Sequence, residues 1–287
     1  MATLKITPRP YHYTLMEIID EACADAIRKA EAERDAQPKG RMQISFEVIS
    51  GCQTQRELAT MLAEKMNAMA RFKKDYTWHS VQNKGYYDVA GWTVNGSRIQ
   101  SPAFFLKELP TITQQMKAFS GMKLASAVLI HCRLEKDTIA SLQHCLNALT
   151  ILEARRELLE MALVDTAALS EKENELKIIY DNDLALSLPL GAFDLPKVEA
   201  AICVLHQAVC MGEATGKARM KPCDMSNPKY QMRTWLLRLG FIGDTFENAR
   251  HTLLDGLDGN AAYFNETSKD RAEAKRHSKN TEMEETA

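Results

Sequence analysis

The sequence predicts an α+β protein made of two β-α-β-β units followed by a C-terminal helical region. Three observations lead to this prediction. The order strand, helix, strand, strand is found over residues 41–100 and again over residues 124–190. Amphipathic helix patterns with their own start and stop signals then follow over residues 191–265. The chain of 287 residues is 45% apolar and 26% charged, which is typical of a globular protein of about two domains.

The first unit, residues 41–100, begins with MQISFEVI, whose alternation of apolar and polar residues is typical of a half-buried strand. Thr54 and Glu57 have the spacing of a capping box, so we expect a helix from residue 55 to about residue 70. The segments YYDVAG and WTVNGSRI then predict two strands. Their turn is expected at Ala90-Gly91 or at Asn95-Gly96.

The second unit, residues 124–190, repeats this order. It has the strand SAVLIHCRL, a helix over residues 135–163, and the strands LKIIY and LALSLPL on either side of Asp181-Asn182-Asp183. Residues 101–123, with two prolines, are expected to be a linker with some helix. Further helices are expected over residues 195–212, 229–239 and 244–257, the last two ended by Gly240 and Gly259.

Both ends of the chain are predicted to lie outside the core. Residues 1–40 contain one amphipathic helix and read as an N-terminal appendage. Residues 266–287 are charged and almost free of large apolar residues, so we expect a disordered tail. There is no export signal at the start and no apolar run of the ~20 residues that a membrane span needs. We therefore expect a cytoplasmic protein without a membrane partner.

The sequence contains no recognisable catalytic motif. G-x-S-x-G, the P-loop and a G-x-G-x-x-G after a strand are all missing, so we expect no catalytic residues and no cofactor. An enzyme with an unrecognised site stays open as an alternative. The seven cysteines form no C-x-x-C pair and are expected to be mostly buried thiols. Cys203, His206 and Cys210 have a spacing that can hold a metal on one helix face, but their apolar surroundings favour core packing and no metal site is expected.

Two groups of residues are candidates for binding. The aromatic residues Tyr86, Tyr87 and Trp92 of the first hairpin could stack on a base or a partner, although burial in the core is the simpler interpretation. The second group is basic and could pair with the phosphates of a nucleic acid or nucleotide; the alternative is a solvated loop and helix face. This group consists of Lys217, Arg219, Lys221, Lys229, Arg233 and Arg238.

The helices over 229–239 and 244–257 also have the order of a helix-turn-helix. A DNA reader would place the start of its second helix on the bases, and here that turn holds Asp244 and Glu247, which phosphates repel. The apolar residues of this pair, Leu236, Leu237, Phe241 and Ile242, are expected to be core. We therefore favour two packed helices over a DNA-binding motif.

The segment NPKYQMRTWLLRLGFIGDTFENARHTLLDGLDGNAAY resembles the C-terminal signature of a family of phage and prophage proteins usually labelled "virulence-related protein". The hairpin YYDVAGWTVNGSRI resembles a second piece of that family, with Ala90-Gly91-Trp92 in place of a double glycine and tyrosine. The likeness covers about residues 43–265 and is strong over 227–264. It implies an origin in a phage or mobile element and supplies no mechanism.

From this resemblance and the missing catalytic motifs, we expect a non-enzymatic accessory protein of the bacterial host cytoplasm. It would bind and neutralise a host protein, for example a factor of antiviral defence. A homo-oligomer is compatible with this expectation. The alternative is a nucleic-acid or nucleotide binder that uses the basic segment 217–238. The balance of 36 basic and 38 acidic residues gives no global field toward either class of partner.

Overall fold

A computed structural model describes residues 40–69, 76–81, 84–134, 139–164, 175–181, 183–221 and 223–264. The chain divides into two units at Lys39–Gly40, and every described residue belongs to the second unit. The expected N-terminal helix and C-terminal tail lie outside the described residues. No helix in the described ranges combines the length and apolar character needed to cross a bilayer.

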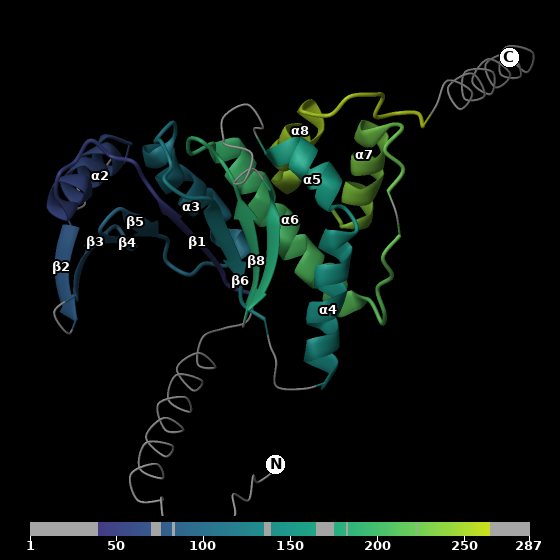
Figure 1. The fold of residues 1–287 in the computed structure, drawn as a ribbon, viewed down its shortest axis with the longest axis horizontal. Helices are drawn as coiled ribbons and strands as arrows, with labels where there is room; N and C mark the ends of the chain where they lie inside the picture. Colours follow the sequence, from purple (N-terminus) through teal and green to yellow (C-terminus); the bar gives the residue numbers. More distant parts are fainter. Residues whose placement is uncertain are drawn as a thin grey trace, which may run out of the picture. The chain divides into compact units, whose positions relative to one another are not determined.

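The described chain is an α+β protein with one antiparallel sheet of eight strands (Figure 1). The sheet order is β2-β3-β4-β5-β1-β6-β8-β7. The strands are β1 (Met42–Glu47), β2 (Tyr76–Val81), β3 (Lys84–Val89), β4 (Trp92–Asn95), β5 (Arg98–Gln100), β6 (Val128–Cys132), β7 (Lys177–Asp181) and β8 (Asp183–Leu188). The helices are α2 (Gln55–Met69), α3 (Leu109–Met116), α4 (Ile139–Glu153), α5 (Arg156–Leu163), α6 (Leu195–Ala214), α7 (Pro228–Arg238) and α8 (Glu247–Asp255).

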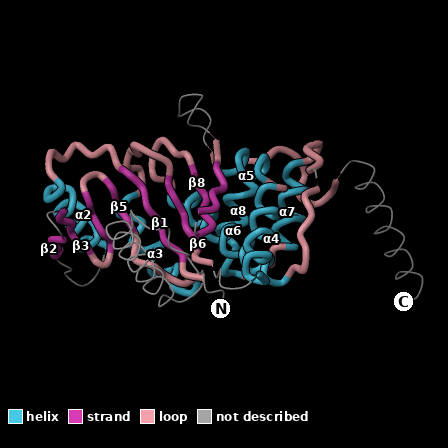
Figure 2. The backbone as a smooth tube through the Cα atoms, turned by 60° about the horizontal axis from the view of Figure 1, so that its bottom comes forward, coloured by secondary structure: helices cyan, strands magenta, loops and turns pink. Residues whose placement is uncertain are grey.

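The two predicted units are halves of this one sheet. In each half the first strand pairs with the last: β1 pairs with β5, and β6 pairs with β8. The halves are joined by antiparallel pairing of β1 with β6, with Ser45 opposite Leu129. Figure 2 shows β1, β6 and β8 side by side, with the C-terminal helices gathered beyond them. The units therefore share a sheet and a core instead of folding separately.

The first half departs from the predicted β-α-β-β order, because four strands follow its helix. WTVNGSRI is a tight hairpin, β4–β5, that turns at Gly96, and the segment before YYDVAG adds β2. Both expected turns form, since Ala90 and Gly91 also adopt the positive φ of a two-residue hairpin loop. The N-cap half of the predicted capping box forms, because the Thr54 hydroxyl accepts from the Glu57 N–H at 3.2 Å. The Glu57 carboxylate accepts from the Gln53 N–H at 2.9 Å, one residue before the N-cap.

Two further expectations on element boundaries were wrong. The helix expected over residues 135–163 is broken at Ala154-Arg155 into α4 and α5. The last helix starts at Glu247 instead of at residue 244, because Asp244–Phe246 form a 3₁₀ turn, and it ends at Asp255. The linker 101–123 contains α3 with a 3₁₀ turn at each end.

The core lies between one face of the sheet and the helices. Alternation along β1 places Ile44 and Phe46 in this core. Phe46 packs on Trp92, Phe119 and Phe193 with ring centroids 4.8–6.5 Å apart. The expected burial of Trp92 is confirmed, and its indole N–H donates to Gln115 Oε1 at 2.8 Å. Tyr86 and Tyr87 are half-buried.

Helix α6 organises the C-terminal half. It contacts β6 and β8 on one side and α4 and α8 on the other, which Figure 1 shows as the helix between the sheet and the outer helices. Asp194 caps its start by accepting from the Lys197 N–H at 3.2 Å, and the next residues include a proline suited to a first turn. Helix α8 thus packs on α6, and α7 packs on α8.

Candidate interaction site

The six basic residues of the predicted site lie in two places. Lys217, Arg219 and Lys221 are exposed on the loop between α6 and α7. Lys229, Arg233 and Arg238 lie on α7, where the first is half-buried and the other two are exposed. At ~100° per residue, Arg238 points about 180° away from Lys229, so α7 does not present its three cations on one face. Arg238 therefore lies on the opposite face of α7 from Lys229.

The loop that carries the first three cations is fixed by Asn147 of α4. This side chain is buried, and its amide N–H groups donate to the carbonyls of Gly212 and Thr215. Its carbonyl oxygen accepts from the Ala218 N–H at 2.9 Å. A second anchor comes from Arg155, which donates to the Lys221 carbonyl at 3.1 Å. The cations thus project from an ordered loop, and no ion pair within the described ranges involves them.

A groove of about 320 Å³ lies between α7 and α8. We call it the α7–α8 groove. Its apolar lining includes Leu237 and Ile242, whose exposed fractions are 47% and 69%. The full lining is Arg233, Leu236, Leu237, Phe241, Ile242, Gly243, Arg250, His251 and Leu254. The volume falls at the lower end of ~300–1,000 Å³, the range of pockets that bind small ligands.

Leu237 and Ile242 correct a sequence prediction. Leu236 and Phe241 are buried as expected, but Leu237 and Ile242 are not. The reason is the turn at Gly240, whose φ of +83° ends α7 and reverses the chain. Helical periodicity shows which residues share a face, but it does not show whether another element will cover that face after the chain turns. Here no described element covers Leu237 and Ile242.

The loop that forms the rim of the groove is held from α8. Arg250 donates from one guanidinium nitrogen to the carbonyls of Phe241 at 3.1 Å and Gly243 at 2.8 Å. Two backbone bonds, from Phe241 N–H to the Leu236 carbonyl and from Ile242 N–H to the Gly240 carbonyl, fix the turn itself. These hydrogen bonds fix the conformation of the turn, and Ile242 is exposed in that conformation.

The end of the described chain is tied to α7 by Asn227. Its side-chain oxygen caps α7 by accepting from the Tyr230 N–H at 3.1 Å. Its amide donates to the carbonyls of Asn260, Tyr263 and Phe264 at 2.9–3.2 Å. This explains Asn227 and the turn at Gly259-Asn260 as structural parts of the C-terminal segment, separate from the groove.

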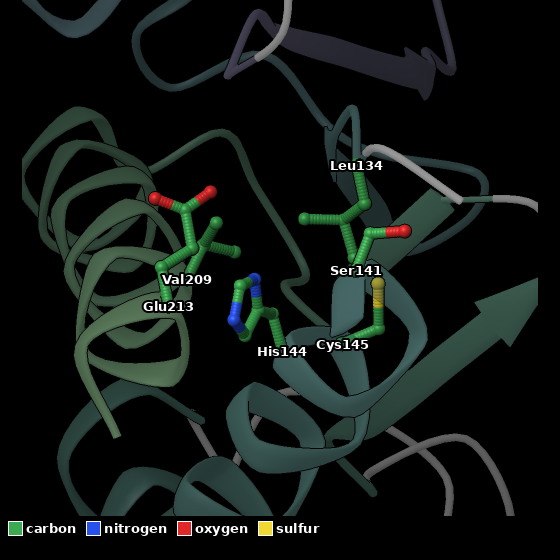
Figure 3. A pocket seen from close by; sticks show the side chains of 6 residues that line it. All are labelled: Leu134, Ser141, His144, Cys145, Val209 and Glu213. Atoms are coloured by element: carbon green, nitrogen blue, oxygen red, sulfur yellow. The ribbon is translucent and has the colours of Figure 1, made fainter. Parts of the chain in front are cut away.

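A small cavity between α4 and α6 brings together a thiol, an imidazole and a carboxylate. Figure 3 shows His144 of α4 and Glu213 of α6 directed into the same space, with Cys145 on the side of Leu134. The cavity holds about 20 Å³, enough for one water molecule and not for a substrate. Cys145 is buried and hydrogen-bonds with Tyr180. This arrangement does not support a Cys–His nucleophile.

Among the other described cysteines, Cys132 and Cys203 are buried, whereas Cys52 and Cys223 are half-buried. Burial raises the pKa of the Cys132 and Cys203 thiols and lowers the pKa of the half-buried His206. Cys210 is exposed, with its sulfur 3.7 Å from His206 Nδ1. Across the described ranges, no group of three His, Cys, Asp or Glu side chains has the arrangement of a metal site.

No protein-family model matches the chain, and no curated protein matches it in sequence. The α7–α8 groove and the basic loop are exposed features that core packing does not explain, and other exposed apolar residues, such as Leu142 and Leu146 of α4, lie outside the groove. Sequence analysis identified the loop from its charge. It missed the groove, because the signal is exposure of apolar residues and not their presence.

Proposed function

We propose that this protein is a phage or mobile-element accessory protein that binds and neutralises a host protein without chemistry of its own. The observation that carries the proposal is the α7–α8 groove with Leu237 and Ile242 open to solvent. Large apolar side chains that gather around a hollow are typical of protein-binding surfaces, whereas isolated ones are common everywhere. The resemblance of residues 227–264 to phage proteins supplies the biological setting.

The test is capture of a partner from a bacterial extract at low salt. The wild-type chain is expected to retain one host protein in stoichiometric amount, with a protein-like ratio of absorbance at 260 and 280 nm. Ile242→Ser is expected to lose it, and Arg219→Glu, which changes the basic loop, is expected to keep it. The activity of the retained factor, measured with and without the chain, then tests neutralisation. Equal capture by wild type and Ile242→Ser would contradict this use of the groove.

The second candidate function is binding of a nucleic acid or nucleotide by the basic segment. It is favoured by one observation, the ordered loop on which Lys217, Arg219 and Lys221 are exposed without a carboxylate partner among the described residues. Phosphate contacts give binding that weakens steeply with salt. Reversing Arg219 and Arg233 together is expected to abolish such binding while Ile242→Ser leaves it intact. Salt-independent retention of nucleic acid, or no effect of the double reversal, would count against this candidate.

A further inference from the structure

We infer that the α7–α8 groove takes an acidic segment of a partner protein that inserts an apolar side chain. This inference rests on the proposed function and names the chemistry of its partner. The floor of the groove is apolar and its rim carries positive charge, and this charge favours an acidic occupant over a second copy of the chain.

The floor gives the apolar part of the recognition. Leu237 and Ile242 stand on either side of the turn at Gly240, and the buried Leu236 and Phe241 line the same groove. Backbone hydrogen bonds fix this turn, so the apolar surface is formed before a partner arrives. An open groove between two helices fits the mode in which one or two apolar anchors of a segment enter a preformed channel.

The rim gives the charge. Arg233, Arg250 and His251 line the groove. Both hydrogen bonds described for Arg250 go to carbonyl oxygens, and Arg233 donates to the Ala261 carbonyl at 3.3 Å, so these neutral acceptors leave the guanidinium charges uncompensated. Glu247 is the one carboxylate paired with a rim residue among the described side chains, at 3.9 Å from His251 Nε2. A carboxylate on an incoming segment can approach either arginine in the fixed fork geometry that arginine favours.

The sign of the rim decides between occupants. A two-fold contact with a second copy would place two copies of this cationic rim in one interface, because both subunits use the same patch. A nucleic acid would match the charge but would leave Leu237 and Ile242 without an apolar partner. An acidic segment with an apolar anchor satisfies both the floor and the rim.

The experiment measures fluorescence anisotropy of a labelled peptide added to the full chain. The probe is a short helical peptide with leucines at i, i+3 and i+7 and glutamates at the exposed positions. The matched peptide has lysines in place of the glutamates. The acidic peptide is expected to bind about tenfold more tightly or better, with the difference shrinking as salt is added. Equal binding of the two peptides would overturn the inference.

Variants locate the binding. Ile242→Ser removes most of one apolar contact and is expected to weaken the acidic peptide about tenfold. Arg233→Glu is expected to reverse the preference between the two peptides. Ile49→Ser is the control, because Ile49 is 62% exposed and lies outside the groove. Binding that Ile242→Ser and Arg233→Glu leave unchanged, as Ile49→Ser does, would overturn the assignment to this groove.

A photo-crosslinking side chain at position 242 identifies the natural occupant. Mapped crosslinks to a partner segment rich in aspartate and glutamate would support the inference. Crosslinks to a second copy, to residues 281–287 of the same chain or to a basic segment would overturn it. The outcomes separate from those of the proposed function. If the acidic peptide binds in the groove but no host protein is retained, only the proposed function falls. If a host protein is retained equally by wild type and Ile242→Ser, only the groove assignment falls.

Discussion

Replacing Gly212 by alanine tests the packing that holds the basic loop and the C-terminal helices in place. Gly212 lies in the last turns of α6, where helix propensity alone favours alanine over glycine by about 1 kcal/mol. The structure predicts the opposite sign. A Cβ atom at this position would lie 2.7 Å from the His144 carbonyl oxygen and 2.8 Å from the Ala148 nitrogen of α4. Both are backbone atoms, so neither can rotate away.

The size of the effect follows from these distances. Ordinary van der Waals contact of a Cβ begins at 3.4 Å, so α4 and α6 must separate locally by several tenths of an ångström. Overpacking of a core costs about 1–3 kcal/mol, and contacts with backbone belong at the upper end of that range. After the gain in helix propensity is subtracted, the free energy of unfolding should fall by about 2 kcal/mol.

The assay is thermal unfolding followed by circular dichroism. At about 2–4 °C per kcal/mol for a domain of this size, Gly212→Ala should lower the Tm by about 4–8 °C. The matched control is Gly216→Ala, four residues later in the exposed loop, where a Cβ meets no atom within 4 Å. That change should leave the Tm unchanged or raise it slightly, because alanine restricts the unfolded chain. An unchanged or higher Tm for Gly212→Ala would refute the close approach of α4 and α6.

Three further predictions concern polar groups that the fold has buried or half-buried. Asn147→Ala removes the side chain that anchors the basic loop, so the free energy of unfolding should fall by about 2–4 kcal/mol. The Ala218 amide should also lose protection from hydrogen exchange. An unchanged exchange rate at Ala218 would show that Asn147 does not anchor the loop. Asn227→Ala should cost about 1–3 kcal/mol because a helix cap and the bonds to residues 260–264 are lost together, whereas Asn227→Asp should retain the cap, and equal unfolding midpoints for the two variants would contradict this division. Burial lowers the pKa of His206 below its usual 6.5, so the unfolded chain binds more protons than the folded chain. The free energy of unfolding should therefore be fully present above pH 6.5 and fall as the pH drops through the folded-state pKa. His206→Gln should flatten this dependence of the free energy of unfolding on pH, measured in unfolding curves at pH 5–7, and an identical dependence would rule out the contribution.

Local signals in the sequence were reliable where they act over a few residues. Thr54 with Glu57 and Gly240 predicted helix ends that the structure contains, because a cap or a left-handed turn depends only on its own neighbours. The break between α4 and α5 was not predicted. No proline or glycine marks Ala154-Arg155, and the apolar pattern resumes after it at Leu158 and Leu159. Helix α5 packs against α8, so tertiary contacts, and not a proline or glycine, accompany the change of direction between α4 and α5.

The candidate site likewise has parts that the sequence predicts and parts that it does not. The exposed cations of the loop were predictable, since a run of basic residues around prolines and glycines seldom becomes core. Their anchor was not, because Asn147 precedes Ala218 by 71 residues and looks like any helical asparagine in sequence. The groove was not predictable either, since exposure depends on what stands opposite a residue in space.

The sequence by itself determined the α+β class, the order of most elements and the caps that begin and end several helices. These are consequences of periodicity and short-range hydrogen bonding. Only the tertiary structure decided that both halves share one sheet through β1 and β6, and that Leu237 and Ile242 are open to solvent while Leu236 and Phe241 are not. The hydrophobic effect has no direction, so the presence of an apolar residue in the sequence does not show which surface will cover it. The fold alone decides whether the chain supplies that surface or leaves the place for another protein.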